Sequence, residues 1–303
     1  MLPDARTGFY RSSRFDWSGM ISSARYQGRE YLGFPFSEHR PEETQYGIGT
    51  AEEFRACVPG VADALGYPEA GVGDGFIKIG VGILRKDARE AYHFAKKYEL
   101  MKAGEWHLEF ADRSVFFSQT LILNARHGYE YVKTIALDAE KPVFTITHSL
   151  KNLGAERIHI HHYCHNFFLM DAGGVGSNDR ALFPFLPQME LGRCHGSEYL
   201  RVQENTVGFL RNIANADMVG GDVVGYASTP AHNTFRMENG RTGIGVRVSS
   251  DRPAVSMYLC AGERFFSVEP QIEIKCQTGE RMEWTNTYEL YAGVPAISPF
   301  AIA

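Results

Sequence analysis

The chain has 303 residues, of which 44% are hydrophobic and 22% are charged, so it can bury a sizeable core in one large domain or in two ordinary ones. The net charge of −5 comes from mixed signs without a basic block, which argues against nucleic acid as a partner. No window approaches the apolar length of a membrane span, so we expect no membrane partner either.

The first quarter of the chain contains short strand signals and one long excursion. Residues 14–36 are typical of the start of a β-meander. Residues 37–75 are rich in acidic residues, Gly and Pro, and 46–54 favours a loop with a short helix. This excursion is either a wall of a cleft or a solvated insertion. In 76–86, Gly80 and Gly82 indicate close backbone approach in a strand or bend rather than a phosphate-binding loop.

Strand signals then recur every 8 to 12 residues or so, which is typical of an antiparallel sandwich or barrel. The expected strands are Tyr92–Leu100, Trp106–Phe110, Ser114–Leu123, Tyr129–Leu137, Val143–Leu150, Asn233–Glu238, Thr242–Ser249, Ala254–Cys260, Phe265–Glu269 and Arg281–Ala292. We find no long amphipathic helix, no internal repeat and no clear linker. The pattern therefore predicts one all-β domain that spans residues 1–303.

One apolar run, residues 157–169, carries four histidines. If it is a strand, alternation places one polar set of side chains on one face: His159, His161, Tyr163 and His165. The other face is mostly core-like: Ile158, Ile160, His162 and Cys164. A strand with this pattern is typical of the floor of a binding cleft. Taken singly, His159 and His162 are most simply core histidines that backbone groups satisfy.

A second stretch, residues 265–271, places a carboxylate among apolar side chains. Alternation sets Ser267, Glu269 and Gln271 on one face, close to an expected bend at Pro270. Desolvation there would raise the pKa of Glu269 and make it a competent base near neutral pH. The alternative is that Glu269 caps a turn or pairs with an arginine.

These two stretches together resemble the motifs of the galactose mutarotase (aldose 1-epimerase) superfamily. Cys164-His-Asn-Phe-Phe-Leu169 is similar to its mid-chain Asn-His-x-Tyr-Phe-Asn-Leu-like motif, and Val268-Glu-Pro-Gln271 to its C-terminal Leu-Glu-(Pro or Thr)-Gln-like motif. The resemblance implies a large antiparallel β-sandwich, the mutarotase-like supersandwich, with a concave sugar-binding cleft. It also implies an isomerase that interconverts the α and β anomers of a hexose or modified hexose without a cofactor or metal.

The resemblance assigns His165 as the general acid and Glu269 as the general base, facing each other across one cleft at about the width of a sugar ring. The early Gly-Arg-x-x-Asn-Arg-like string of the family is absent from this chain. Substrate contacts are expected instead from Arg85, His93, His161, His162 and Asp222. A phosphorylated sugar would want a cation cluster, which Arg85, Lys86 and Arg89 could supply.

Two other classes of function remain open at this point. His159-x-His161 is a ligand spacing used by metal-dependent, cupin-like β-barrel enzymes, but no carboxylate follows between His161 and Asp171. The third class is a non-catalytic carbohydrate-binding protein.

The cysteines and the N-terminus bear on the compartment. The five cysteines are scattered without a Cys-x-x-Cys pair, which favours a reducing environment over a disulfide framework. The first residues lack the apolar region of a signal peptide. We therefore expect a cytoplasmic protein.

Overall fold

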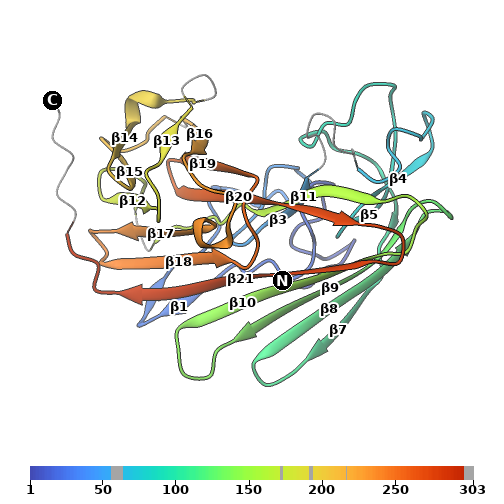
Figure 1. The fold of residues 1–303 in the computed structure, drawn as a ribbon, viewed down its shortest axis with the longest axis horizontal. Coiled ribbons are helices and arrows are strands. Elements are labelled where there is room, and N and C mark those ends of the chain that lie inside the picture. Colours follow the sequence, from blue (N-terminus) through green and yellow to red (C-terminus); the bar gives the residue numbers. More distant parts are fainter. Residues whose placement is uncertain (56–63, 171–172, 191–193, 216, 297–303) are drawn as a thin grey trace.

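Two large antiparallel β-sheets make up most of the computed structural model, which describes residues 1–55, 64–170, 173–190, 194–215 and 217–296 (Figure 1). The larger sheet has ten strands. In spatial order they are Leu200–Gln203 (β14), Thr206–Phe209 (β15), Asp179–Leu182 (β12), Thr234–Asn239 (β17), Ile244–Ser250 (β18), Arg281–Ala292 (β21), Val143–Asn152 (β10), Gly128–Leu137 (β9), Ser114–Ile122 (β8) and Trp106–Phe110 (β7).

The second sheet has six strands and carries both sequence motifs. Its order is Gln188–Met189 (β13), Val219–Val224 (β16), Ser256–Gly262 (β19), Phe265–Cys276 (β20), Ile158–Cys164 (β11) and Glu52–Arg55 (β3). The smaller elements are a three-stranded sheet of Gly75–Lys78 (β4), Gly82–Arg85 (β5) and Leu100–Ala103 (β6), a hairpin of Arg25–Tyr26 (β1) and Arg29–Glu30 (β2), and 3₁₀ turns at Ser197–Tyr199 (η2) and Pro230–His232 (η3).

The core between the two large sheets explains the pattern of the histidine-rich strand. Ile160 of β11 and Ile274 of β20 are buried in one cluster with Tyr129, Leu150 and Trp284 of the ten-stranded sheet. The predicted apolar face of residues 157–169 is thus confirmed, and so is the all-β class. No helix in the described ranges is long and apolar enough to cross a membrane.

Two local predictions were wrong. Residues 92–99 are irregular, with a turn at 94–95, rather than a strand. Tyr92 and Tyr98 stack on each other in the core, with ring centroids 5.3 Å apart, and β6 begins only at Leu100. The short helix expected within 46–54 is absent from those residues, where β3 begins at Glu52. Part of the long excursion, 56–63, lies outside the described residues.

The prediction of a bend at Pro270 is also wrong, because β20 runs through this residue without a break. The ladder between β20 and β11 ends at the pair of Ile272 and His162. Proline has no N–H to donate, so an interruption at this point is expected. Beyond it, Asn166 adopts a left-handed backbone with φ of 50°, and its Nδ2 donates to the carbonyl of Val268 at 3.2 Å. The two strands thus stay together next to His165.

Candidate functional site

The two sequence motifs meet at a direct contact between His165 and Glu269. His165 follows the last residue of β11, and Glu269 lies in the middle of β20. Nδ1 of His165 is 2.9 Å from Oε1 of Glu269, and both side chains are largely buried. Since a carboxylate only accepts hydrogen bonds, Nδ1 carries the ring proton in this contact. The contact is closer than the sugar-ring separation that the sequence predicted.

The other side of the imidazole faces a second buried network. NH2 of Arg14 and the hydroxyl of Tyr163 each lie 3.0 Å from Nε2 of His165. Nε of Arg14 donates to Oε2 of Glu53 at 2.8 Å, and the Tyr163 hydroxyl donates to the same oxygen at 2.7 Å. His165 therefore joins a carboxylate on one side to an arginine, a tyrosine and a second carboxylate on the other.

Opposing effects set the protonation of this cluster. Burial lowers the pKa of His165, but the Glu269 carboxylate in contact with it raises that pKa above its ordinary value overall. Burial would raise the pKa of Glu53, but the cations of Arg14 and Lys78 hold it well below its usual range. Glu53 is therefore held as a carboxylate, and the contact with Glu269 favours the protonated form of His165.

Apolar rings and one hydroxyl hold the pair in place. The Phe15 ring meets the His165 ring edge-on at 5.0 Å between centroids, and Phe167 lies parallel to it at 5.4 Å. Ser267 Oγ lies 3.0 Å from Oε1 of Glu269 and also contacts the backbone carbonyl of His165. These contacts restrict the rotation of both side chains.

Two of the other predicted residues share the face of the sheet that carries the pair. Asp222 pairs with Tyr258 across β16 and β19, and Tyr258 pairs with Glu269 across β19 and β20. Directly opposed residues in an antiparallel sheet point to the same face. Asp222 therefore lies in the same row as Glu269, two strands away. His161 also lies on this face, with Nδ1 3.3 Å from Oε1 of Gln271.

Arg85 and His93 are not joined to the pair by any contact within the described ranges. Arg85 forms an ion pair with Glu99 at 2.8 Å. His93 is exposed, and its Nδ1 accepts from the backbone N–H of Ala95 at 3.3 Å. Lys86 donates to a carbonyl inside the protein, that of Tyr67, so it is not free to bind a phosphate together with Arg85.

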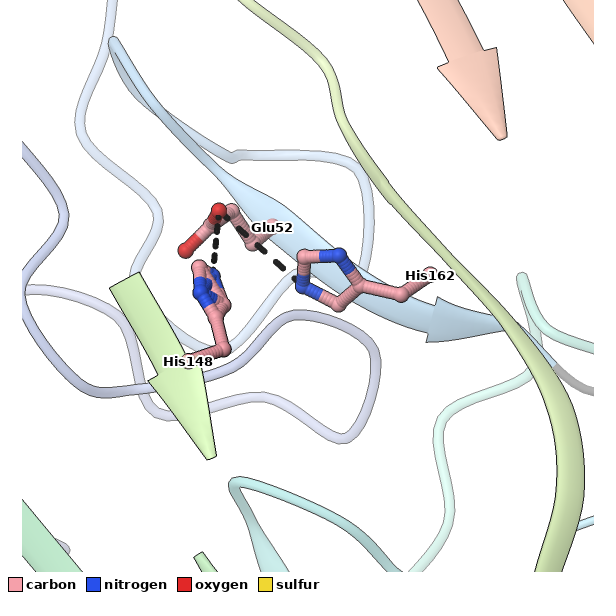
Figure 2. Close-up of side chains that lie close together, drawn as sticks. All are labelled: Glu52, His148 and His162. Carbon is pink, nitrogen blue, oxygen red and sulfur yellow. Dashed lines mark hydrogen bonds and ion pairs between the residues drawn. The ribbon is translucent and has the colours of Figure 1, made fainter. Parts of the chain in front are cut away.

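His162 points into the core, away from the face that carries His165. Its side chain forms a buried group with Glu52 and His148, whose ligand-type atoms all lie within 4.8 Å of one another. Figure 2 shows one carboxylate oxygen of Glu52 between the two imidazoles, 3.0 Å from Nε2 of His148 and 4.0 Å from Nε2 of His162. Among the residues that the structure describes, His159 and His161 do not form such a group, because His159 pairs with Glu273 and His161 with Gln271.

The chemistry of this buried group does not fit a metal. Nζ of Lys133 lies 2.5 Å from Oε2 of Glu52, so an ammonium already occupies one oxygen of this carboxyl group. Nε1 of Trp284 is only a donor and lies 3.2 Å from Nδ1 of His162, which must therefore accept. Neutral His162 then carries its proton on Nε2, the atom that would have to bind the metal. The hydrogen-bonded arrangement and a metal exclude each other.

Sequence reasoning missed Arg14, Glu53 and Tyr163 as members of the site. Tyr163 was placed on the correct face but given no role. Glu53 did carry a signal, because two consecutive glutamates in the apolar surroundings of Ala51 and Phe54 need buried partners. Arg14 lies outside the strands of both sheets, where alternation predicts nothing.

Two cavities lie away from the pair. One of about 20 Å³, room for about one water molecule, is lined by Tyr163, Asn166 and Tyr288 among others. The other, of about 640 Å³, lies between the β1 segment and the β8–β10 part of the large sheet. Neither of these two cavities is lined by His165 or Glu269, although Tyr163, which lines the smaller one, contacts His165. The His165 side chain itself is 12% exposed.

Comparison with solved structures identifies a protein with a similar fold. The Slr1438 protein from Synechocystis sp. PCC 6803 matches at 11% identity and a TM-score of 0.50, with 88% of this chain and 86% of that chain covered. The chain is similar in fold to Slr1438. A galactose mutarotase-like protein from Lactobacillus casei ATCC 334 (11% identity, 90% and 100% covered, TM-score 0.47) and the GalM/aldose epimerase homologue from C. elegans (12%, 90% and 99%, 0.45) also match.

No family model matches the chain, and a search of curated proteins finds no match. At these identities, the likeness to Slr1438 concerns the fold alone. The activity therefore has to be argued from the site.

Proposed function

We propose that the protein is an aldose 1-epimerase-like isomerase that interconverts the α and β anomers of a hexose or modified hexose. The observation that carries the proposal is the buried contact between His165 and Glu269, which unites the two motifs that resemble the mutarotase superfamily. The reaction needs one acid and one base at a single acetal carbon, and no redox cofactor.

In the proposed reaction, the Glu269 carboxylate removes the proton of the anomeric hydroxyl. The imidazolium of His165 gives its Nδ1 proton to the ring oxygen as the bond between this oxygen and the anomeric carbon breaks, and so becomes a neutral imidazole. The open-chain aldehyde turns about its bond to the second carbon, and closure from the other face gives the other anomer. In closure, Glu269 returns its proton to the carbonyl oxygen and His165 takes back the proton of the attacking hydroxyl, so both residues regain their starting state.

A contact distance between the acid and the base is compatible with this reaction. The two oxygens that exchange protons are bonded to the same carbon, so the acid and the base need not lie on opposite sides of a sugar ring. A substrate that approaches the edge of the pair can meet Nδ1–H with its ring oxygen and the carboxylate with its hydroxyl. The hydrogen bond between the two side chains has to lengthen when this happens.

The same contact favours one alternative, a protein that binds sugars without catalysis. In the structure, the acid and the base are paired with each other, and His165 is held on its other side as well. If the pair never opens, the polar face of the six-stranded sheet can still bind a sugar through side chains such as His161 and Asp222.

Exchange of anomers can be measured at equilibrium by NMR saturation transfer between the two anomeric protons across a panel of hexoses, hexose phosphates and uronates. The proposal predicts faster exchange with the wild type and a loss of about 10²–10⁴-fold in His165→Gln and Glu269→Gln. The chain offers a matched control, since His159 and Glu273 form a second such pair on the same two strands, at 2.8 Å. His159→Gln and Glu273→Gln should keep the activity.

If no sugar exchanges faster but line broadening or chemical-shift changes show that sugars bind, the protein is a binding protein and the catalytic proposal is wrong. It is also wrong if all four variants lose activity equally, because the effect would then not be specific to the His165 pair.

A further inference from the structure

Arg14 lies where it decides which nitrogen of His165 can carry a proton. Its NH2 group is 3.0 Å from Nε2 of His165. A guanidinium has donors only and keeps its charge in proteins. In this geometry Nε2 has to act as the acceptor, so the ring proton resides on Nδ1, the atom that faces Glu269.

Without Arg14, the imidazole would lie between two carboxylates. Glu269 is 2.9 Å from Nδ1, and Glu53 is 3.9 Å from Nε2. Two flanking carboxylates favour an imidazolium with a proton on each nitrogen. Arg14 counteracts this, because Nε binds Glu53 at 2.8 Å while NH2 of the same guanidinium points at Nε2.

The remaining polar groups around the ring do not replace Arg14. The Tyr163 hydroxyl has one proton and already lies 2.7 Å from Glu53. Burial, and then the negative charge of Glu53, raise the pKa of Tyr163 well above its ordinary value, so it stays a neutral phenol. Lys78 reaches Glu53 on its other oxygen, Oε1, at 3.4 Å.

We infer that Arg14 is a positioning residue that disfavours a proton on Nε2 of His165, so that the neutral ring carries its single proton on Nδ1, beside Glu269. The pair then presents one donor and one acceptor side by side, His165 Nδ1–H and the Glu269 carboxylate. The catalytic meaning of this arrangement rests on the proposed function, whereas the location of the proton does not.

The tautomer can be measured without any substrate. Long-range ¹H–¹⁵N correlation spectra of protein labelled with ¹⁵N-histidine distinguish Nδ1–H from Nε2–H in a neutral imidazole, and the signals of His165 are those missing from His165→Gln. Above the titration midpoint of His165, we expect the Nδ1–H pattern. An Nε2–H pattern in the wild type would overturn the inference.

A variant tests whether Arg14 is responsible. In Arg14→Met the titration midpoint of His165 should shift upward, because Glu53 then faces Nε2 without the guanidinium between them. Arg126→Met is the matched control, since Arg126 lies at the surface in an ion pair with Glu156, and its midpoint should equal that of the wild type. An unchanged or lower midpoint in folded Arg14→Met contradicts the inference.

If Arg14→Met does not fold, the wild-type spectrum can still overturn the inference, because a proton on Nε2 of the neutral ring is incompatible with a guanidinium donor 3.0 Å away. Failure of the inference also differs from failure of the proposed function. If the protein exchanges no anomers but shows Nδ1–H on His165, the inference holds and the proposed activity is wrong. If the protein is active but shows Nε2–H, the proposed activity holds and the inference is wrong.

Discussion

Glu52 and Glu53 are consecutive residues of β3, and their carboxylates lie on opposite faces of the six-stranded sheet, both without solvent exposure. Glu52 joins Lys133 in the core, and Glu53 joins Arg14 at the site. Burial raises the pKa of Glu52 to about 7 even beside Lys133, whereas the two cations around Glu53 outweigh its burial and hold its pKa well below the usual range. One short strand thus places one carboxyl group in the core and one at the site. Burial favours the protonated form of Glu52, whereas the neighbouring cations favour the ionised form of Glu53.

Glu52 should make the stability of the fold depend on pH in a specific direction. Its pKa is about 7 in the folded protein against an ordinary 4.5, so between these values the folded state holds a proton that the unfolded state lacks. The free energy of unfolding contributed by Glu52 is therefore fully present below 4.5 and falls as the pH rises to 7.

Urea unfolding of the wild type and of Glu52→Gln across this interval checks the direction. The wild type minus variant difference in free energy of unfolding should decrease with rising pH. The buried His148 and His162, whose pKa values burial lowers, are present in both proteins, so their contribution cancels to first order. A difference that is flat or increases with pH contradicts the prediction.

Glu53→Gln should be strongly destabilising. It removes the carboxylate that the buried cations of Arg14 and Lys78 share, and with it the ion pair of Arg14 at 2.8 Å. Breaking a buried pair in this way costs about 3–5 kcal/mol, to be measured as the change in the free energy of unfolding by urea. Glu42→Gln, which removes a surface ion pair with Lys97, is the control and should show no measurable loss. Equal stability of the two variants would refute the role given to Glu53.

Asn166 should be sensitive to replacement by alanine. Its Oδ1 accepts from the Tyr288 hydroxyl at 2.8 Å, and its backbone is left-handed. Asn166→Ala removes the carbonyl acceptor of this buried hydroxyl, which then has only the weakly hydrogen-bonding thiol of Cys164, and strains the backbone, at a cost of about 2–4 kcal/mol. Asn166→Gly also loses the hydrogen bond, but glycine adopts the left-handed backbone without strain. It should therefore be the less destabilising of the two substitutions. The reverse order in thermal or urea unfolding would show that the hydrogen bond and the backbone are not the causes.

Zinc should not bind to the core group of Glu52, His148 and His162. Binding there would need Nε2 of His162 without its proton, and the hydrogen bond from Trp284 requires that proton. We expect the same melting temperature with added Zn²⁺ and with a chelator, and no stoichiometric metal by elemental analysis. A zinc-dependent rise in melting temperature that disappears in His148→Ala would mean that the tautomer assigned to His162 is wrong.

The parts of the site that follow from strand alternation and from motifs could be predicted from the sequence. Alternation along 157–169 separated His165 from His162 correctly, because period two is a local property of the chain. The convergence of His165 with Glu269 followed from two short motifs. The direct contact between them did not, because it depends on how the ladder between β11 and β20 ends at His162 and Ile272 and on the backbone of Asn166.

The remaining members depend on contacts that no local pattern encodes. Arg14 reaches the site from an irregular segment, and His148 meets His162 from the opposite sheet. Arg85 illustrates the converse error. A cation that follows an apolar run is often a functional residue, yet here it pairs with Glu99 from the neighbouring turn. Whether each of these residues reaches the site depends on how the two sheets pack together and on the path of the N-terminal segment.

The contact between Arg14 and His165 joins residues 151 positions apart, and Glu269 comes later still. During synthesis, the arginine therefore leaves the ribosome long before the imidazole that it touches, and the imidazole long before its carboxylate. Long-range contacts of this kind form slowly because chain entropy has to be lost first. The pair of His165 and Glu269 therefore forms only after residue 269 has emerged, more than a hundred residues after the histidine itself.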